Sequence, residues 1–141
     1  MAKLRRPANA AVVDVLAWIC IQDRRLLCAR SQGNEVFYLP GGKREQGESD
    51  WDGLRREVTE ELSVSLEQAS FDHLMTVEEI AHGYDEPTWV TMKCFQSGYA
   101  GGLVPSGEIE EIAWLSNADK VCCAPATQRV FEYLCDRNLI D

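Results

Sequence analysis

The chain has 141 residues, about the length of one domain, of which 45% are apolar and 26% charged. Its 23 Asp and Glu residues outnumber 14 Lys and Arg residues, and the net charge of −9 disfavours nucleic-acid polymers and anionic membranes as partners. The apolar stretch over residues 10–21 is interrupted by Asp14 and is too short to span a membrane. We therefore expect one cytoplasmic domain over residues 1–141.

The first third of the chain predicts strands. Residues 10–22 and 25–30 are rich in Val, Ile and Leu and flank a turn-like Gln22-Asp23-Arg24, which predicts a β-hairpin. A polar loop over residues 31–35 leads to a short predicted strand, residues 36–39. Pro40 lacks a backbone donor, and Gly41 and Gly42 permit unusual backbone angles, so a sharp turn is expected there.

A helix is predicted from Ser49 or Asp50 to Leu62, with Ser49 as its N-cap. At about 100° per residue, its carboxylates and its apolar side chains occupy different faces. The carboxylate face holds Glu57, Glu60 and Glu61, and the apolar stripe holds Trp51, Leu54, Val58 and Leu62. Like charges at this spacing destabilise a helix slightly, so a divalent cation between them is the natural explanation.

The rest of the chain returns to strands and ends in a helix. Residues 71–80 and 88–99 predict a strand pair, residues 109–115 a further strand, and residues 125–139 a second helix. The packing stripe predicted for that helix consists of Val130, Phe131, Leu134 and Leu139. This order of elements indicates an α+β or α/β/α sandwich fold.

The six cysteines include no CxxC pair, and only His73 and His82 could join them as soft metal ligands. We interpret them as small buried or half-buried thiols in a reducing compartment. A zinc site or a disulfide framework is the alternative.

The segment from Gly42 to Val64 resembles the Nudix box, whose pattern is G-x5-E-x7-R-E-U-x-E-E-x-G-U with U a bulky aliphatic residue. Gly42, Glu48 and the run from Arg56 to Val64 match it, except that Ser63 replaces glycine. Because a left-handed conformation costs a non-glycine residue about 1–2 kcal/mol, Ser63 is expected to adopt another angle and to shift the following strand slightly. The flanking strands also resemble a Nudix domain, so the likeness covers nearly the whole chain.

The resemblance implies a Nudix-type α/β/α sandwich with a mixed β-sheet between helices. It also implies hydrolysis of a diphosphate linkage in a nucleoside triphosphate or related nucleoside-diphosphate derivative, with release of a monophosphate and pyrophosphate. Mg²⁺, or Mn²⁺, is the implied cofactor, and hard oxygen ligands are what magnesium selects. The alternative is a non-catalytic Nudix module that senses a nucleotide or binds a partner.

The family's motif implies roles for individual residues. The implied metal ligands are Glu57, Glu60 and Glu61, with the carbonyl of Gly42. One of these glutamates, or Glu108 near the last strand, is expected to accept the proton of the attacking water, although Glu110 or Glu111 could serve instead. Arg56 lies four residues before Glu60 and is expected to orient a carboxylate. Glu48 either supports the loop, reaches the metal or is a surface carboxylate.

The substrate-binding candidates are Arg30, Lys43 and Thr127. Arg30 and Lys43 could contact phosphate oxygens or lie exposed at the surface. Thr127 occupies the place where mutator-type relatives carry a base-reading asparagine, which weakens an 8-oxo-guanine assignment without removing it. The aromatic side chains that could stack on a base, or pack in the core or at its rim, are Trp18, Tyr38, Tyr84 and Trp89. A small nucleotide is the expected partner, and the protein is expected to be a monomer or homodimer.

Overall fold

The computed structural model describes residues 6–81 and 83–141 of the chain. His82 and the first five residues, including Lys3 and Arg5, lie outside the described residues. The elements in chain order are β1 (Ala11–Ile19), β2 (Ile21–Gln22), β3 (Arg25–Ser31), β4 (Gly41–Lys43), α1 (Asp50–Leu62), β5 (Ser65–Leu66), the 3₁₀ helix η1 (Gln68–Ser70), β6 (Asp72–Ile80), β7 (Thr88–Gln96), β8 (Tyr99–Ala100), β9 (Ile109–Leu115), the 3₁₀ helix η2 (Asn117–Cys122) and α2 (Pro125–Asp136).

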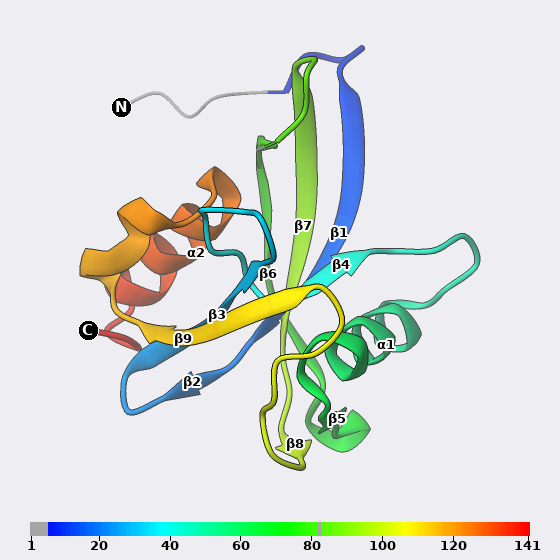
Figure 1. Ribbon diagram of the computed structural model, residues 1–141. Coiled ribbons are helices and arrows are strands. Elements are labelled where there is room, and N and C mark those ends of the chain that lie inside the picture. Colours follow the sequence, from blue (N-terminus) through cyan, green and yellow to red (C-terminus); the bar gives the residue numbers. More distant parts are fainter. Residues whose placement is uncertain (1–5, 82) are drawn as a thin grey trace.

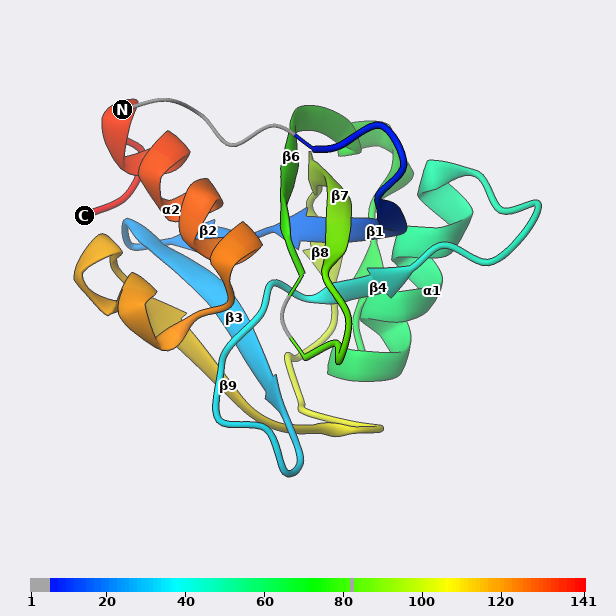
Figure 2. The same cartoon turned by 90° about the horizontal axis from the view of Figure 1, so that it is seen from above.

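A mixed four-stranded sheet of order β4-β1-β7-β6 lies between α1 on one side and α2 on the other (Figures 1 and 2). Strand β1 runs parallel to β7, whereas β4 and β6 are antiparallel to their neighbours. A second sheet of order β2-β3-β9 lies beside it. The expected α+β sandwich with a mixed sheet between helices is therefore confirmed.

The side chains of β1 alternate between the two faces of the four-stranded sheet and so belong to both core clusters. Leu16 and Trp18 pack in the cluster that holds α1, while Ala17 and Ile19 pack in the cluster that holds α2. Successive side chains of a strand point to opposite faces, so this short segment contributes to both halves of the core. Each fully buried large apolar side chain stabilises the fold by about 1.5–3 kcal/mol.

The predicted hairpin is correct only at its tip. Strand β2 pairs with β3 across a tight turn in which Asp23 and Arg24 both have positive φ. Most of the first segment is the separate strand β1, which pairs with β7 from Ala11–Thr88 to Ile19–Gln96. Residues 16–19 are buried on both faces, and such a strand needs neighbours on both edges, which one hairpin partner cannot supply.

The region around Gly41 also differs from expectation. Residues 36–39 form no strand; Phe37 and Tyr38 make isolated bridges to Cys123 and Ala29. The glycines, expected in a sharp turn, instead form β4, antiparallel to β1. A Cβ on Gly41 would lie 2.0 Å from the carbonyl oxygen of Leu16, so glycine is required for the close approach of two backbones.

Helix α1 has the predicted bounds, and the Ser49 hydroxyl accepts a hydrogen bond from the Asp52 N–H at 3.1 Å. The expectation for Ser63 was wrong, because this residue is left-handed with φ 64° and ψ 24°. Its N–H donates to the carbonyl of Thr59 at 3.1 Å, and its hydroxyl contacts Ser106 at 3.3 Å. These bonds offset the cost of the left-handed conformation.

The strand pair β6–β7 and strand β9 are confirmed, but β7 ends at Gln96 and Tyr99 belongs to the short strand β8. Helix α2 ends at Asp136, and Leu139 is 40% exposed, so the predicted stripe consists only of Val130, Phe131 and Leu134. The six cysteines are free thiols, although Cys122 is exposed. No helix in the described ranges is long and apolar enough to cross a membrane.

Candidate active site

Helix α1 positions the carboxylates by burying its opposite face. Leu54, Val58 and Leu62 are fully buried against β1 and β3. Gly53 lets the helix approach the sheet, because a Cβ there would lie 2.6 Å from a methyl carbon of Leu16. The apolar stripe therefore fixes the rotation of the helix, and Glu57, Glu60 and Glu61 are carried on the remaining surface.

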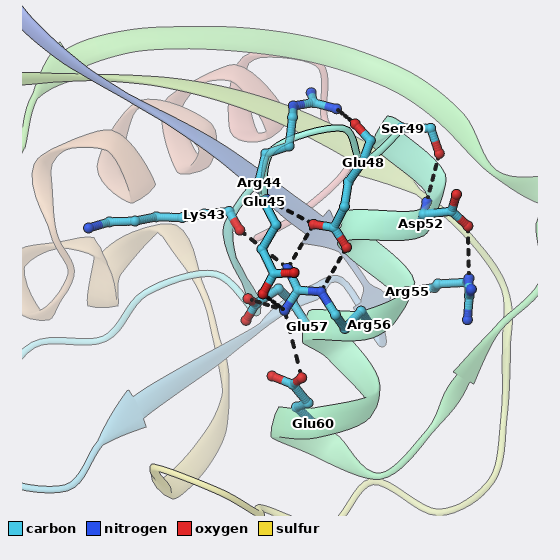
Figure 3. A network of polar contacts seen from close by, with 10 residues as sticks. All are labelled: Lys43, Arg44, Glu45, Glu48, Ser49, Asp52, Arg55, Arg56, Glu57 and Glu60. Carbon is cyan, nitrogen blue, oxygen red and sulfur yellow. Dashed lines mark hydrogen bonds and ion pairs between the residues drawn. The ribbon is translucent and has the colours of Figure 1, made fainter.

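Arg56 is the centre of the polar network drawn in Figure 3. Its Nε and Nη2 donate to the two carboxylate oxygens of Glu48 at 2.8 and 2.9 Å, and its Nη1 donates to Glu57 at 2.8 Å. Glu60 lies farther away, with 3.7 Å between its Oε1 and Nη1 of Arg56. The guanidinium therefore holds Glu48 and Glu57 more closely than Glu60.

Glu48 supports the loop before α1. Its Oε1 accepts a hydrogen bond from the Glu45 N–H at 2.8 Å, and its side chain is 16% exposed. The Arg56 guanidinium, together with that N–H, lowers the pKa of Glu48 to about 2. Of the three roles left open by the sequence, the structure supports the loop-supporting one, because both oxygens are already bonded.

Glu57 and Glu61 are both partly desolvated. Burial raises the pKa of Glu57, and the Arg56 guanidinium opposes that shift. Burial raises the pKa of Glu61 to about 8; the Gly41 N–H, which donates to Oε1 at 2.8 Å, opposes the shift, and the charges of Glu57, Glu60 and Glu108 add to it. Glu60 is the most exposed of the three, at 61% of its side chain. A cation nearby would favour the ionised form of Glu61.

The donor set suits a hard divalent cation. Within residues 6–81 and 83–141, no three Asp, Glu, His or Cys side chains are close enough together to hold a metal ion as they stand. Two of the glutamates are instead bonded to Arg56 and to the Gly41 N–H. Gly42 leaves room beside them, because a Cβ there would lie 2.5 Å from the carboxylate of Glu57. Carboxylate and carbonyl oxygens next to a desolvated acid are the donors that a hard divalent cation prefers.

Glu108 lies exposed in the turn before β9 and contributes to the raised pKa of Glu61. Its alternatives are already bonded, since Arg30 donates to Glu110 at 3.0 Å and to Glu111 at 3.1 Å. Arg30 also donates to the Asn34 carbonyl at 3.0 Å. The arginine therefore connects β3 to β9 and does not line the cavity beside β4.

A cavity of about 340 Å³ opens beside the glycines of β4. Its walls are mostly apolar and come from β1, β3, β6, β7 and the start of α2. The polar or charged residues that line it are Ser31, Asn34, Tyr38, Lys43, Glu61, Tyr84 and Thr127. The candidates Lys43, Thr127 and Glu61 thus meet at one cavity, together with Gly42.

Ser31, which ends β3, and Asn34, in the loop after it, were missed by the sequence analysis, because a polar residue at the end of a strand or in a loop has no periodicity that marks it. The Asn34 amide lies 3.5 Å from the Tyr38 hydroxyl, and the Lys43 ammonium lies 5.6 Å from the centre of the Tyr84 ring. Of the four aromatic candidates, only Tyr38 and Tyr84 line the cavity. Trp18 and Trp89 are buried, at 0% and 8% exposure.

Comparison with known proteins agrees with this geometry. The NUDIX domain family model matches residues 10–132. A MutT protein from Methanosarcina mazei Go1 has a TM-score of 0.70 at 20% identity, over 94% of this chain and 99% of that chain. The E. coli ORF135 protein has a TM-score of 0.69 at 20% identity, over 94% of this chain and 96% of that chain. A MutT NUDIX hydrolase from Burkholderia pseudomallei has a TM-score of 0.66 at 21% identity, over 85% and 95%.

No curated protein matches the chain. Identities near 20% establish a shared fold and leave the substrate open. The family model, in contrast, covers the box, the strands on both sides of it and most of α2. Because this match extends over most of the chain, the protein belongs to the NUDIX domain family.

Proposed function

We propose that the protein hydrolyses the diphosphate linkage of a nucleoside triphosphate, or of a related nucleoside-diphosphate derivative, and releases a monophosphate and pyrophosphate. The observation that carries this proposal is that Gly42 and Glu61 of the box line the same cavity as Lys43 and Thr127. A nucleoside in the cavity would therefore have its phosphates beside the box glutamates. Residues 1–141 would act as one cytoplasmic domain, as a monomer or homodimer.

Glu57, Glu60, Glu61 and the carbonyl of Gly42 would hold Mg²⁺ or Mn²⁺. When bound, such a cation neutralises phosphate charge and lowers the pKa of water. Arg56 keeps Glu57 oriented through the bond of 2.8 Å, and Glu48 keeps Arg56 in place. Glu108, exposed and electrostatically coupled to Glu61, is the proposed acceptor of the water proton.

The cavity walls favour a base over a sugar as occupant. Val13, Leu39 and Met92 are among the apolar residues that line it, and they suit the flat face of a base. Asn34 and Thr127 are polar groups that could read its edge. Lys43 lies exposed beside the glycines, where an ammonium group could meet phosphate oxygens.

The direct test is release of phosphate or pyrophosphate from a panel of nucleoside triphosphates, dinucleoside polyphosphates and nucleotide sugars, with Mg²⁺ or Mn²⁺. Nucleoside triphosphates are expected to be cleaved best. A panel left uncleaved would contradict the proposal. Tight nucleotide binding by calorimetry without turnover would favour the non-catalytic sensor instead.

Two variants test the roles of the glutamates. Glu60→Gln and Glu61→Gln are each expected to lower turnover by orders of magnitude, roughly 10²-fold or more, while circular dichroism shows an unchanged fold. Glu132→Gln on α2, which is bonded to Lys120 and Arg129, serves as a control at a distance from the box. Near-normal activity in both box variants would refute the ligand assignment.

A further inference from the structure

The loop between β8 and β9 is fastened to the C-terminal end of α1. The Val104 N–H donates to the Leu62 carbonyl at 3.0 Å, and the Ser106 N–H donates to the Glu61 carbonyl at 2.8 Å. The Ser106 hydroxyl donates to the Glu60 carbonyl at 2.6 Å. The last carbonyls of a helix have no partner inside it, so this loop supplies the missing donors. In Figure 1 the yellow loop passes the end of α1.

Ser63 adds a bond that glycine could not make at this position. Its hydroxyl lies 3.4 Å from the Val104 carbonyl oxygen and 3.3 Å from the Ser106 hydroxyl. Glycine would adopt the left-handed conformation of Ser63 at less cost, so backbone geometry alone favours glycine there. The serine therefore gives up backbone stability and gains a direct bridge from α1 to the loop.

The backbone of Glu108 is fixed by its own loop and by the loop that follows β3. The Ile109 N–H donates to the Ser106 carbonyl at 3.0 Å, which closes a turn around Gly107 and Glu108. Ile109 is buried, and the Glu108 carbonyl accepts a bond from the Gln32 N–H at 2.8 Å. A Cβ on Gly107 would lie 3.3 Å from the Glu60 carbonyl oxygen, so the turn lies close against α1. The position of Glu108 thus depends on where Ser106 is held.

We propose that Ser63 and Ser106 form a latch between α1 and the β8–β9 loop, and that this latch positions Glu108 for the hydrolytic reaction. Both serines are positioning residues, since neither is among the residues that line the cavity. The proposal rests on the role proposed above for Glu108. The Ser106 hydroxyl carries most of the effect, because its bond to the Glu60 carbonyl is the shortest in the latch.

The test compares Ser63→Gly, Ser106→Ala and the control Ser65→Ala. Ser65 is exposed in β5 and has no side-chain hydrogen bond among the described residues, so its variant should match wild type. Ser63→Gly is expected to keep or raise Tm yet to lower kcat about threefold, and Ser106→Ala to lower kcat about tenfold, with little change in KM. An unchanged kcat in both variants overturns the proposal.

A double-mutant cycle separates positioning from general support of the fold. In a Glu108→Gln background, neither serine variant should lower kcat further, because the group that the latch positions is already removed. Equal losses in both backgrounds would overturn the proposal. If wild type hydrolyses no nucleotide, the proposed function fails separately. Amide hydrogen exchange at Val104 and Ser106, expected to be faster in Ser63→Gly, still tests the latch, and unchanged exchange would overturn it.

Discussion

Replacing Gly42 by alanine should disable the site without unfolding the protein. The backbone of Gly42 lies outside the left-handed region, so alanine can adopt it. The new Cβ would lie 2.5 Å from the Glu57 carboxylate, whereas ordinary contact begins at 3.4 Å. Glu57 must therefore retreat by about 0.9 Å, and a misplacement near 1 Å in an active site costs roughly 10²-fold in rate. We expect a loss of kcat of that size.

The fold should tolerate this change. Strain on the bond of 2.8 Å between Arg56 and Glu57 costs at most about 1 kcal/mol, and Gly→Ala returns about 0.4–1 kcal/mol through the unfolded chain. In a domain of this size, 1 kcal/mol corresponds to roughly 2–4 °C in Tm. Calorimetry should therefore place Tm within a few degrees of wild type.

Two other glycines are matched controls for the assay of pyrophosphate release. Gly102 has open space around its missing Cβ and no positive φ, so Gly102→Ala should be silent. Gly41 has φ 144° and would place its Cβ 2.0 Å from the Leu16 carbonyl oxygen, so Gly41→Ala should destabilise the fold by about 2–4 kcal/mol. Wild-type activity in Gly42→Ala would refute the placement of Glu57, and a large loss of Tm would show that the effect is structural.

Two further predictions concern the same network. Arg56→Lys should lower kcat about 10- to 100-fold, because lysine cannot bond both carboxylate oxygens of Glu48 and, at the same time, Glu57. Arg55→Lys on the exposed face is the control and should leave kcat unchanged. Equal activities of the two variants would contradict the orienting role of Arg56. In metal-free protein, the pKa of Glu61 is about 8 in the folded state, whereas the ordinary value for a glutamate is 4.5. Because the folded state binds this proton more tightly than the unfolded state, the free energy of unfolding should fall as the pH rises from 4.5 to 8. Glu61→Gln should flatten that slope in Tm, and a slope as steep as in wild type would assign the titration to another group.

The helix of the box was predictable because its signals are local. Ser49 caps it, and the burial of Leu54, Val58 and Leu62 follows from periodicity alone. The position of the carboxylate face then follows from the same helical periodicity, without knowledge of which strands the helix packs on. The resemblance to mutator-type relatives, and no local signal, placed Thr127 near the start of the last helix, and it lies in the first turn of α2.

What the sequence did not predict depends on partners that lie far away in the chain. Nothing near β1 indicates that its parallel neighbour is β7, about 77 residues later. The bonds of Arg30 to Glu110 and Glu111 arise only when β9 lies beside β3, so a cation that appeared available to phosphate is neutralised by acids of the chain. The left-handed Ser63 is similar, because its compensating contact with Ser106 comes from a loop 43 residues away.

The two faces of α1 have opposite effects on the stability of the fold: the carboxylate face destabilises it and the apolar face stabilises it. Burial of Glu61 and repulsion from Glu57, Glu60 and Glu108 make the ionised site unfavourable without a cation, as the raised pKa of Glu61 shows. Arg56 lowers this cost at Glu57 but makes no bond to Glu61. The opposing contribution comes from Leu54, Val58 and Leu62, each fully buried and stabilising by about 1.5–3 kcal/mol. Because those contacts do not involve the carboxylates, the helix stays folded although the acids on its other face repel one another.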